Sequence, residues 1–338
     1  MDNHEQFSTT LPTGTNSRLQ HQLDVLEQIR QLCLEKTISY VFMLGDTFHR
    51  RKFIDTDVMY HTFRSYKAIS QVVNGNFYIL VGNHDQHNKI GSVHSLEPFK
   101  EIAKVIDSPR QIVTEGLKFC AMPFTANIGE WKDVTKDWSG DLFIFHQGLS
   151  EATVGAYDVY IKAEIGLGDV PRDRFRYCFA GHYHKRQLFK SGNSNVTGFI
   201  GSPLQLSMGE RLEDKGFTIL DLGTGEIEFV ESKAPKFRLF ESAKEFDDFC
   251  FTHPVWNTSD FIRVRDADKY RLEKIKDQLP EVQVELLDEE KVLEPSRVDA
   301  DTISNDKTLL ESYIDQRGNS LDKKDLLKLG LDLLASED

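Results

Sequence analysis

An apolar run that ends in Gly82-Asn83-His84-Asp85 constrains the fold of this chain more than any other stretch. Residues 79–81 are Ile-Leu-Val, which is typical of a buried strand, and the glycine after them permits a tight turn. The turn then presents an amide, an imidazole and a carboxylate. Because ligands of open α/β sheets bind in the crevice beyond the carboxyl ends of the strands, we expect a chemical site here.

Other candidate metal-binding side chains also follow apolar runs. They are Asp46 after residues 38–44, His146 after residues 142–145, and His182 and His184 in a Gly-His-Tyr-His sequence after residues 177–180. Asp2 and His4 form a further D-x-H pair at the amino end, with no strand before it. Oxygen and imidazole ligands without thiolates suit Mn²⁺, Fe²⁺ or Zn²⁺ with open coordination positions.

With Asn83 and His84, the set has eight groups, which are too many for one ion and about right for two ions that share a bridging carboxylate. Paired divalent ions roughly 3.5–4 Å apart are a recurring solution for phosphoester hydrolysis. A lone histidine after a strand is more often structural, and we assign to that class three histidines without a motif: His87, His94 and His253. The ordered set of motifs therefore predicts a two-metal phosphoesterase.

The pattern along the chain indicates an α/β protein. Apolar residues at helical spacing predict helices over 18–36 and 55–73, with a strand over 38–44 between them and another helix near 95–104. From about residue 112 short strands dominate, namely 117–123, 142–146, 177–181, 187–190, and the pair 216–222 and 226–231 joined as a hairpin by Gly-Thr-Gly. This order predicts a sandwich of mixed sheets flanked by helices, of the α/β (α+β) class.

The carboxyl-terminal part predicts further modules after a first domain at 1–232. Residues 233–288 alternate strand and helix again and read as a small α/β module. Residues 289–301 are acidic and contain proline, which is typical of a linker. Residues 302–338 contain two short amphipathic helices that cannot bury their apolar faces alone, so they either dock on the body or bind a partner.

The composition limits the cellular setting and the substrates. Four cysteines are scattered singly, which favours reduced thiols in a cytosol over disulfides or a thiolate zinc site. No apolar run approaches the ~20 residues that span a bilayer, and no signal peptide opens the sequence, so we expect a soluble, cytoplasmic protein. The net charge of −13 argues against broad nucleic-acid binding unless positive charge is local or comes from metal ions or a partner.

The motifs together resemble those of the calcineurin-like metallophosphoesterase superfamily. Within it, Gly45-Asp46-Thr47-Phe48-His49 followed by Arg51-Lys52 resembles the DNA-repair nuclease branch of SbcD and MRE-type nucleases, to which phage recombination endonuclease subunits belong. Protein phosphatases of the superfamily usually carry an arginine before Gly-Asn-His, where this chain has Val81. Further motifs similar to the nuclease branch are Phe145-His146-Gln147, Gly201-Ser202-Pro203 and Lys215-Gly216-Phe217. The resemblance covers residues 2–232 well and residues 233–338 by architecture only.

The resemblance implies a four-layer sandwich of two mixed β-sheets flanked by helices, with two divalent ions, most readily Mn²⁺. The implied ligands are Asp2, His4 and His184 for one ion, Asn83, His146 and His182 for the other, and Asp46 as the bridge. His84 would stabilise or protonate the leaving oxygen, and His49 would be a second catalytic histidine near the scissile phosphate. A metal-bound hydroxide is the expected nucleophile.

The partners that the resemblance implies are DNA and an SMC-like coiled-coil ATPase of the SbcC type. Residues 233–288 would be a DNA-facing cap, and the helix pair at 302–338 would dock on the coiled-coil root of the ATPase, which could carry much of the DNA binding. Helices near 57–73 and 95–104 would form a homodimer within a heterotetramer. Phosphates could also be held by basic residues that flank two motifs, although a solvated loop explains them equally well: Arg50, Arg51, Lys52, Lys185 and Arg186.

One departure from the superfamily concerns the amino end, because members carry a core strand immediately before the D-x-H, whereas here Met1 precedes Asp2. We therefore expect a truncated or misassigned start, with Asp2 and His4 as the least secure ligands. The leading function is an Mn²⁺-dependent endo/exonuclease subunit that acts on DNA ends in recombination and repair. The alternatives are a small-molecule or phosphoprotein metallophosphoesterase, and a catalytically impaired scaffold for the ATPase.

Overall fold

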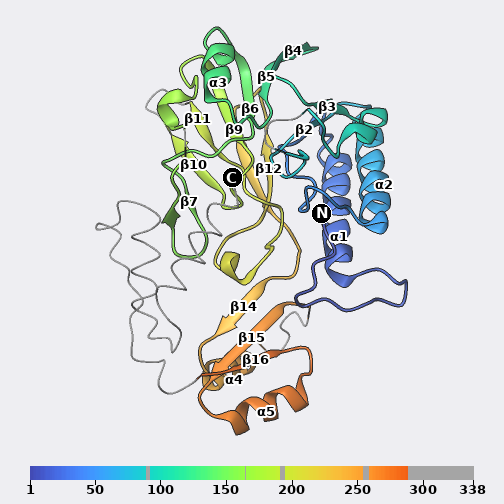
Figure 1. Cartoon of the computed structure of the whole chain (residues 1–338), viewed down its shortest axis with the longest axis vertical. Coiled ribbons are helices and arrows are strands. Elements are labelled where there is room, and N and C mark those ends of the chain that lie inside the picture. The colour runs from blue at the N-terminus through green and yellow to red at the C-terminus, as the bar shows by residue number, and fades with distance from the viewer. Residues whose placement is uncertain (89–91, 164, 191–194, 254–258, 288–338) are drawn as a thin grey trace, which may run out of the picture. The chain divides into compact units, whose positions relative to one another are not determined.

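The computed structural model of this chain describes residues 1–88, 92–163, 165–190, 195–253 and 259–287 (Figure 1). These residues form helices and several sheets, so the predicted mixed α/β class is confirmed. Met1–Glu285 group into one compact unit. The predicted linker at 289–301 and the helix pair at 302–338 lie outside the described residues, and the predicted division after residue 232 stays a prediction. None of the helices that the structure describes is long and apolar enough to cross a membrane.

Two helices, α1 (Ser17–Glu35) and α2 (Thr56–Val72), cover a parallel sheet. The side chain of Asn16 begins α1 by accepting from two backbone N–H groups of the first turn, which would otherwise be unpaired. The sheet has the order β1-β2-β3 and consists of β1 (Val41–Met43), β2 (Phe77–Leu80) and β3 (Lys104–Ile106). Strand β2 is buried along its whole length, as its apolar run predicts.

Two predicted elements of this part differ in the structure. The helix expected near 95–104 is a short 3₁₀ helix, η1 (Glu97–Glu101), and residues 104–106 are the strand β3. The physical reason is that Val105 and Ile106 are β-branched and pair with the buried strand β2, which favours the sheet over another helical turn. Strand β1 is shorter than the expected 38–44 because only residues 41–43 pair with β2.

The second sheet has six strands in the order β10-β11-β9-β6-β5-β4. Its strands are β4 (Arg110–Thr114), β5 (Leu117–Met122), β6 (Gly140–Phe145), β9 (Phe175–Ala180), β10 (Gln187–Lys190) and β11 (Val196–Phe199). The four central strands are parallel and both edge strands are antiparallel. Phe145 of β6 pairs with Ala180 of β9, so the residues that follow these two strands emerge side by side.

Smaller elements complete this part of the unit. The expected hairpin is present as β12 (Gly216–Leu220) and β13 (Ile227–Glu231), which pair in antiparallel orientation. A second hairpin and two 3₁₀ helices were not expected: β7 (Thr153–Val154), β8 (Val159–Tyr160), η2 (Leu167–Asp169) and η3 (Met208–Glu210). Helix α3 (Ile128–Thr135) was also not expected, and it buries Trp131 against the phenylalanines of β6.

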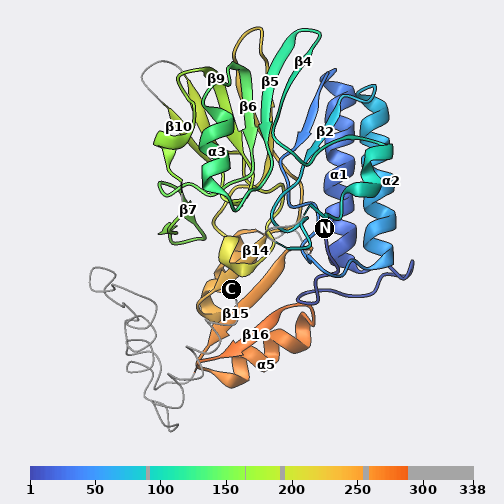
Figure 2. The same cartoon turned by 45° about the horizontal axis from the view of Figure 1, so that its top comes forward.

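The elements lie in layers that three apolar clusters hold together (Figure 2). The first cluster joins α1 and α2 to the parallel sheet, the second lies between the two sheets, and the third joins the six-stranded sheet to α3. Helices α1 and α2 cover the outer face of the parallel sheet, and α3 covers that of the six-stranded sheet. Because the faces of the sheets are occupied in this way, polar side chains can be accessible where the strands end. The strand ends are therefore where a site can form.

The amino end is held against the loop after β1. The backbone N–H₃⁺ of Met1 donates to the carbonyl oxygen of Thr47, and the N–H of His49 donates to the carbonyl oxygen of Met1 over 3.2 Å. Beside it, a cavity of about 900 Å³ lies between α1, β1, β12 and the inner face of the six-stranded sheet. Among the described strands, β1 pairs with β2 alone and β12 with β13 alone, so the other edges of β1 and β12 line this cavity.

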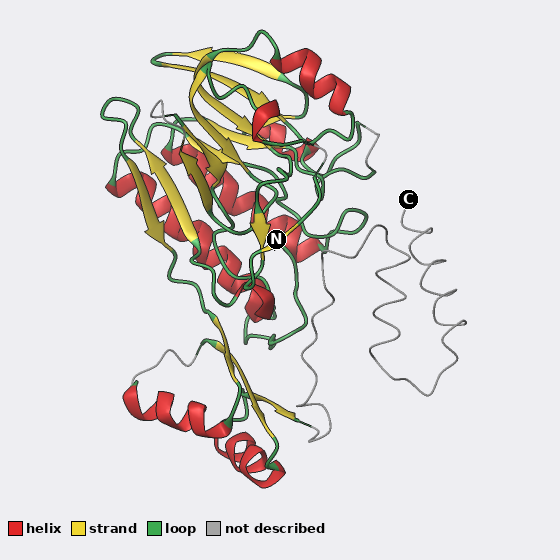
Figure 3. Ribbon diagram, turned by 90° about the vertical axis from the view of Figure 1, so that its left-hand side faces the viewer, coloured by secondary structure: helices red, strands yellow, loops and turns green. Residues whose placement is uncertain are grey.

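The last described elements form a sheet of their own, with the order β14-β15-β16 and two helices (Figure 3). Their bounds are β14 (Phe237–Phe240), α4 (Ala243–Thr252), β15 (Phe261–Asp266), α5 (Lys269–Gln278) and β16 (Gln283–Leu286), close to those expected. Arg18 of α1 joins this sheet to the preceding layers. Its guanidinium lies 5.1 Å from the ring centre of Phe237 and 4.4 Å from that of Phe261, and it donates to the carbonyl oxygen of Leu206 over 3.1 Å.

Arg18→Ala should loosen the contact between the β14–β16 module and the preceding layers. The substitution removes two cation–π contacts and the hydrogen bonds of a buried guanidinium, which together stabilise the fold by about 2–3 kcal/mol. Urea unfolding should show that loss, and limited proteolysis should cut near residues 232–236 sooner. Arg30→Ala on the same helix removes only an exposed pair with Glu27 and should change the unfolding free energy by less than about 0.5 kcal/mol. Equal effects of the two substitutions would contradict this role of Arg18.

Candidate metal centre

The loops after β1 and β2 are tied together by the carboxylate of Asp85. This side chain is fully buried and accepts hydrogen bonds from the backbone N–H groups of Asp46 (2.8 Å), Gly82 (2.9 Å) and Phe48 (3.2 Å). The motif led us to expect a carboxylate presented at the turn, but the structure directs it inward, because three buried donors need an acceptor. Asp85 therefore positions the loop that carries Asp46.

Glycines allow the loops to approach one another around His146. A Cβ on Gly45 would lie 2.3 Å from Nδ1 of His146, and a Cβ on Gly82 would lie 2.2 Å from Oδ1 of Asp46. A Cβ on Gly181 would lie 2.0 Å from a backbone carbonyl oxygen. Real side chains do not tolerate such distances, so the glycine of each of these motifs is required by close approach of the backbone.

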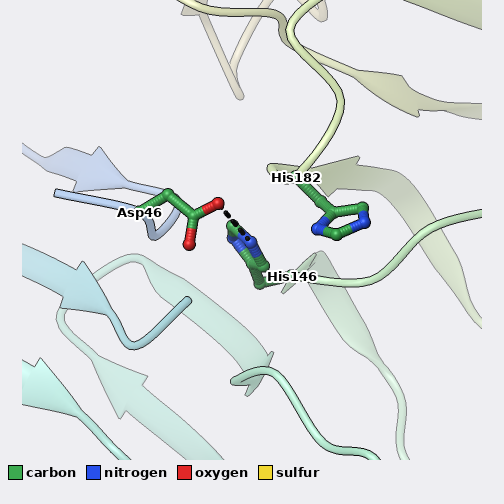
Figure 4. Close-up of side chains that lie close together, drawn as sticks. All are labelled: Asp46, His146 and His182. Atoms are coloured by element: carbon green, nitrogen blue, oxygen red, sulfur yellow. Dashed lines mark ion pairs between the residues drawn. The ribbon is translucent and has the colours of Figure 1, made fainter. Parts of the chain in front are cut away.

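Four side chains from the ends of β1, β2, β6 and β9 meet at one point, and Figure 4 shows three of them, Asp46, His146 and His182. Nε2 of His146 lies 3.2 Å from Oδ2 of Asp46 and 3.1 Å from Oδ1 of Asn83. The same oxygen of Asn83 lies 3.0 Å from Nδ1 of His182. Ligand atoms of Asp46, His146 and His182 all lie within 4.8 Å of one another, which is close enough to surround one cation.

The charge state of His146 is set by its neighbours. Nδ1 donates to the carbonyl oxygen of Leu44 over 2.6 Å, so Nε2 faces the oxygens of Asp46 and Asn83. Burial disfavours a charged imidazole, but the carboxylate of Asp46 outweighs burial and raises the pKa of His146. Burial also disfavours a charged Asp46, but the charge and hydrogen bond of His146 hold the pKa of Asp46 far below its usual range. The pair is thus ionic, and a proton on Nε2 lies where the acceptor atoms converge.

His182 completes the group with a neutral ring. Burial, reinforced by the charge of His146, lowers the pKa of His182 to about 4, so at neutral pH one of its two ring nitrogens has a free electron pair. Asp46 (φ 56°) and His182 (φ 83°) both have left-handed backbones, a strain of roughly 1–3 kcal/mol each that concentrates at ligand-binding sites. A carboxylate, an amide oxygen and two imidazoles fit a divalent cation such as Mn²⁺, Fe²⁺ or Zn²⁺.

His84 and His49, the two predicted catalytic histidines, lie side by side. Their rings are nearly parallel with centres 5.7 Å apart, and Nδ1 of His84 donates to the carbonyl oxygen of His49 over 2.7 Å. The backbone N–H of His84 donates to Oδ1 of Asp46 over 2.8 Å, so the turn places this ring next to the four-residue group. With Nδ1 occupied, Nε2 of His84 is the nitrogen available to a substrate.

Asp2 and His4 lie next to each other at the amino end. Oδ2 of Asp2 is 3.9 Å from Nδ1 of His4, and the His4 ring lies 5.5 Å from that of His49. The side-chain amide of Gln22 holds the backbone of Asp2 by accepting from its N–H (3.0 Å) and donating to its carbonyl oxygen (2.8 Å). The amino end is therefore fixed by Gln22 and Thr47 although no strand precedes it among the described residues.

His184 stands apart from the close group. Its Nδ1 lies 2.8 Å from Oε1 of Glu210, a buried carboxylate for which the sequence offered no motif. Among the residues that the structure describes, Asp2, His4 and His184 do not form a close ligand group of the kind that surrounds His146. The structure thus brings the predicted ligands Asn83, His146 and His182 close together, whereas the other predicted set is more widely spaced.

Three of the five basic residues that flank the motifs have contacts in the structure. Nε of Arg50 lies 3.3 Å from Oδ1 of Asp2, Lys185 forms an ion pair with Asp158, and the Arg186 guanidinium lies 4.8 Å from the ring centre of Phe229. Arg51 is half-buried and Lys52 is exposed. A phosphate would compete with these contacts for Arg50 and Lys185, so the structure favours neither of the two sequence interpretations.

A second group of potential ligands, His94, Glu97 and Asp107, lies near η1 and β3. The ammonium of Lys100 already lies 2.8 Å from Oε2 of Glu97 and 2.9 Å from Oδ2 of Asp107. These are the oxygens that a metal ion would need, so the group is a surface ion-pair cluster. This agrees with the assignment of His94 as a structural histidine.

Comparison with known proteins places these motifs in a wider context. The model of the calcineurin-like phosphoesterase family matches residues 2–186. The DNA double-strand break repair protein Mre11 of Methanocaldococcus jannaschii is 23% identical over 273 residues, which cover 72% of this chain and 71% of that protein. Exonuclease subunit 1 of Enterobacteria phage T4 is 25% identical over 310 residues, which cover 87% of this chain and 85% of that protein. The resemblance predicted from the motifs is confirmed, and both relatives are distant.

Among solved structures, a hypothetical protein from Thermus thermophilus aligns with a TM-score of 0.35 and 13% identity, covering 62% of this chain and 84% of that one. A score of this size supports no argument about the present chain.

Asp85→Asn should weaken both the fold and cation binding. Asparagine has one acceptor oxygen and turns an N–H₂ group toward buried donors, and each buried N–H left unpaired costs about 1–3 kcal/mol. Urea unfolding without metal and a Mn²⁺ titration followed by electron paramagnetic resonance would measure the two effects. Asp141→Asn is the control, because that carboxylate accepts one exposed N–H bond, from Lys118 over 2.9 Å. Equal losses in both variants would show that Asp85 has no special positioning role.

The stability of the metal-free protein should also depend on pH through Asp85. Burial, followed by the charge of Asp46, raises the pKa of Asp85 to about 7, against about 3.9 for an unfolded aspartate. The folded state therefore keeps a proton that the unfolded state releases, and this stabilising contribution is lost as the pH rises from about 4 to about 7. His4 and His182, whose pKa values burial lowers to about 4, act in the opposite sense in both proteins, so the test is a difference. The unfolding free energy of the natural sequence relative to that of Asp85→Asn should fall over this range. Parallel pH profiles would contradict the shift.

Proposed function

This chain belongs to the calcineurin-like phosphoesterase family, whose members typically bind divalent metal ions, and from that premise we propose that it is a two-metal, Mn²⁺-dependent DNA nuclease subunit. It would hydrolyse phosphodiester bonds at DNA ends in recombination and repair, as an endo- or exonuclease. One observation carries the proposal: the nearly parallel rings of His49 and His84 lie next to four side chains that meet at one point. These four are Asp46, Asn83, His146 and His182. The layered body would be the four-layer metallophosphoesterase sandwich.

The convergent group supports the assignment of ligands. In this proposal Asn83, His146 and His182 hold one ion, Asp2, His4 and His184 hold the other, and Asp46 bridges the two. When bound, the paired ions supply an activated water and neutralise charge on the phosphate. To hold an ion through Nε2, His146 would have to lose the proton on that nitrogen, because metal ligation needs the unprotonated nitrogen.

His84 and His49 act on the substrate in this proposal. The hydrogen bond from Nδ1 of His84 to the carbonyl oxygen of His49 fixes the ring, so Nε2 is the nitrogen that would face the leaving oxygen. As an imidazolium, with both nitrogens protonated, His84 would pass the proton of Nε2 to that oxygen. Burial lowers the pKa of His49 in the metal-free protein, and as the second catalytic histidine this ring would hold the scissile phosphate by hydrogen bonding. Protein phosphatases of the superfamily also carry the histidine of Gly-Asn-His, so of these two residues it is His49, in Gly-Asp-Thr-Phe-His, that favours a nuclease.

The remaining residues and modules are assigned by the same resemblance. The β14–β16 module within 233–288 would face DNA as a cap, 289–301 would be a linker, and 302–338 would bind an SMC-like coiled-coil ATPase. A homodimer of the nuclease subunit within a heterotetramer completes the proposed assembly. Because the chain carries a net charge of −13, the ATPase would supply much of the DNA affinity. One relative is named a DNA double-strand break repair protein and the other an exonuclease subunit, and these two names support the proposal.

His84→Ala should abolish cleavage of linear double-stranded DNA in Mn²⁺, with at least about a 100-fold loss of rate, since general acid catalysis contributes that much or more. Fluorescence of end-labelled DNA measures the rate, and bis-p-nitrophenyl phosphate serves as a generic diester. His87→Ala is the matched control, because His87 is an exposed neighbour on the same loop without a motif.

The three possible outcomes separate the candidate functions. Cleavage of DNA that His84→Ala abolishes and His87→Ala preserves supports the nuclease. Cleavage of the small diester without DNA cleavage would replace it with a small-molecule or phosphoprotein phosphoesterase. Inactivity on both substrates while Mn²⁺ is bound at fewer than two sites would support a catalytically impaired scaffold.

A further inference from the structure

Beyond the ligands themselves, the structure points to one more residue of the centre, Glu210. We propose that Glu210 is a positioning residue that fixes the ring of His184 with Nε2 turned to a divalent cation. The inference rests on the proposed function, because it takes His184 as a ligand. It assigns a role to a residue that lies outside every motif of the chain, 26 positions after the histidine it contacts.

The contact defines which nitrogen of His184 can bind a cation. Nδ1 of His184 lies 2.8 Å from Oε1 of Glu210. The other oxygen of Glu210 lies 2.9 Å from Nζ of the buried Lys215, so Glu210 is a carboxylate paired with an ammonium group. A carboxylate can only accept, so Nδ1 carries the hydrogen and Nε2 keeps the free electron pair. This is the tautomer that a metal-binding histidine needs at Nε2.

Glu210 is itself held rigidly, as a positioning residue must be. It is 9% exposed, and its second oxygen lies 2.9 Å from Nζ of Lys215 and accepts from the backbone N–H of Leu206 over 3.1 Å. The carboxylate therefore has three donors, and one of them is the ring of His184. A freely moving surface glutamate would lack the other two.

The same network holds the backbone of His184. Nζ of Lys215 is buried and donates to the carbonyl oxygen of His184 over 2.8 Å and to Oγ of Ser202 over 2.8 Å. Lys215 thus fixes the main chain while Glu210 fixes the ring. His184 itself is 45% exposed at its side chain, so packing alone does not determine its orientation. An exposed ring with a buried, ionised partner is the arrangement expected of a ligand that awaits a cation.

Glu213 offers a matched comparison for Glu210. Oε2 of Glu213 lies 2.7 Å from the same Nζ of Lys215, and its side chain is also buried. Both glutamates therefore compensate the buried ammonium, but His184 contacts Glu210. Substitution of either residue disturbs the charge of Lys215, whereas only Glu210→Gln disturbs the ring of His184.

The test is a Mn²⁺ titration of the metal-free protein, followed by electron paramagnetic resonance of the free ion. Glu210→Gln should weaken binding at one of two sites by about 10–100-fold and leave the other site unchanged, the size expected when the partner of a ligating histidine is lost. Glu213→Gln should leave both affinities unchanged. The ¹⁵N chemical shifts of His184 in the metal-free protein should report Nδ1–H in the natural sequence and a mixture of tautomers in Glu210→Gln.

His184→Ala separates the failure of this inference from failure of the proposed function. If His184→Ala weakens one site and Glu210→Gln does not, the positioning role is wrong and the ligand assignment stands. If His184→Ala changes neither site, both the ligand assignment and the role of Glu210 are wrong. Equal losses in Glu210→Gln and Glu213→Gln, or an unchanged tautomer, would show that Glu210 only compensates Lys215. Urea unfolding of each variant without metal confirms that the titrated protein is folded.

Discussion

Three backbone N–H groups, those of Asp46, Phe48 and Gly82, point at one buried carboxylate, Asp85, and the centre depends on that interaction. It joins the turn after β1 to the turn after β2, although these turns are almost forty residues apart in the sequence. A buried N–H must have an acceptor, so the two turns have one mutual arrangement of low energy. That arrangement puts a left-handed backbone at Asp46 and directs its carboxylate to His146.

The centre is assembled from contacts of two kinds. The inner contacts are short, between acceptor oxygens of Asp46 and Asn83 and the ring nitrogens of His146 and His182. Without a metal ion, the carboxylate of Asp46 raises the pKa of His146, so a proton on that ring compensates the carboxylate. In the proposed function a cation would take the place of that proton. The outer contacts hold the residues in place from behind, through carbonyl oxygens and buried carboxylates. Rigid outer contacts matter because ligand geometry, more than affinity, determines which cation a protein binds.

The net charge of the whole chain is negative, whereas a site for a phosphate needs positive charge. The chain is strongly acidic, and two of the five basic residues that flank the motifs, Arg50 and Lys185, are already paired with acidic partners. In the proposed nuclease, positive potential near the phosphate would then come from bound cations and from histidines. An acidic body also limits non-specific adhesion to nucleic acid. A subunit of this kind would act on a strand that a partner delivers, which is consistent with the proposed assembly.

Much of the fold followed from local patterns. Helices α1 and α2, the strand before Gly82, and the β12–β13 hairpin lie close to where spacing and turn residues place them. Other elements did not: α3, β4 and β11 are short and are stabilised by neighbours in the six-stranded sheet, so their own residues carry a weak signal. The helix expected near 95–104 became η1 and β3 because pairing with β2 outweighs local preference.

For the site, the sequence by itself determined which side chains follow the strands and that Gly82 permits the turn after residues 79–81, because these are local properties of a strand and its turn. It named Asp46, Asn83, His146 and His182, and the fold brings these four together. Only the tertiary structure decided that Asp85 turns inward and that Glu210 lies behind His184. Both facts concern hydrogen bonds between segments far apart in the chain. Such partners are chosen by the packing of sheets against one another, and no local spacing encodes them.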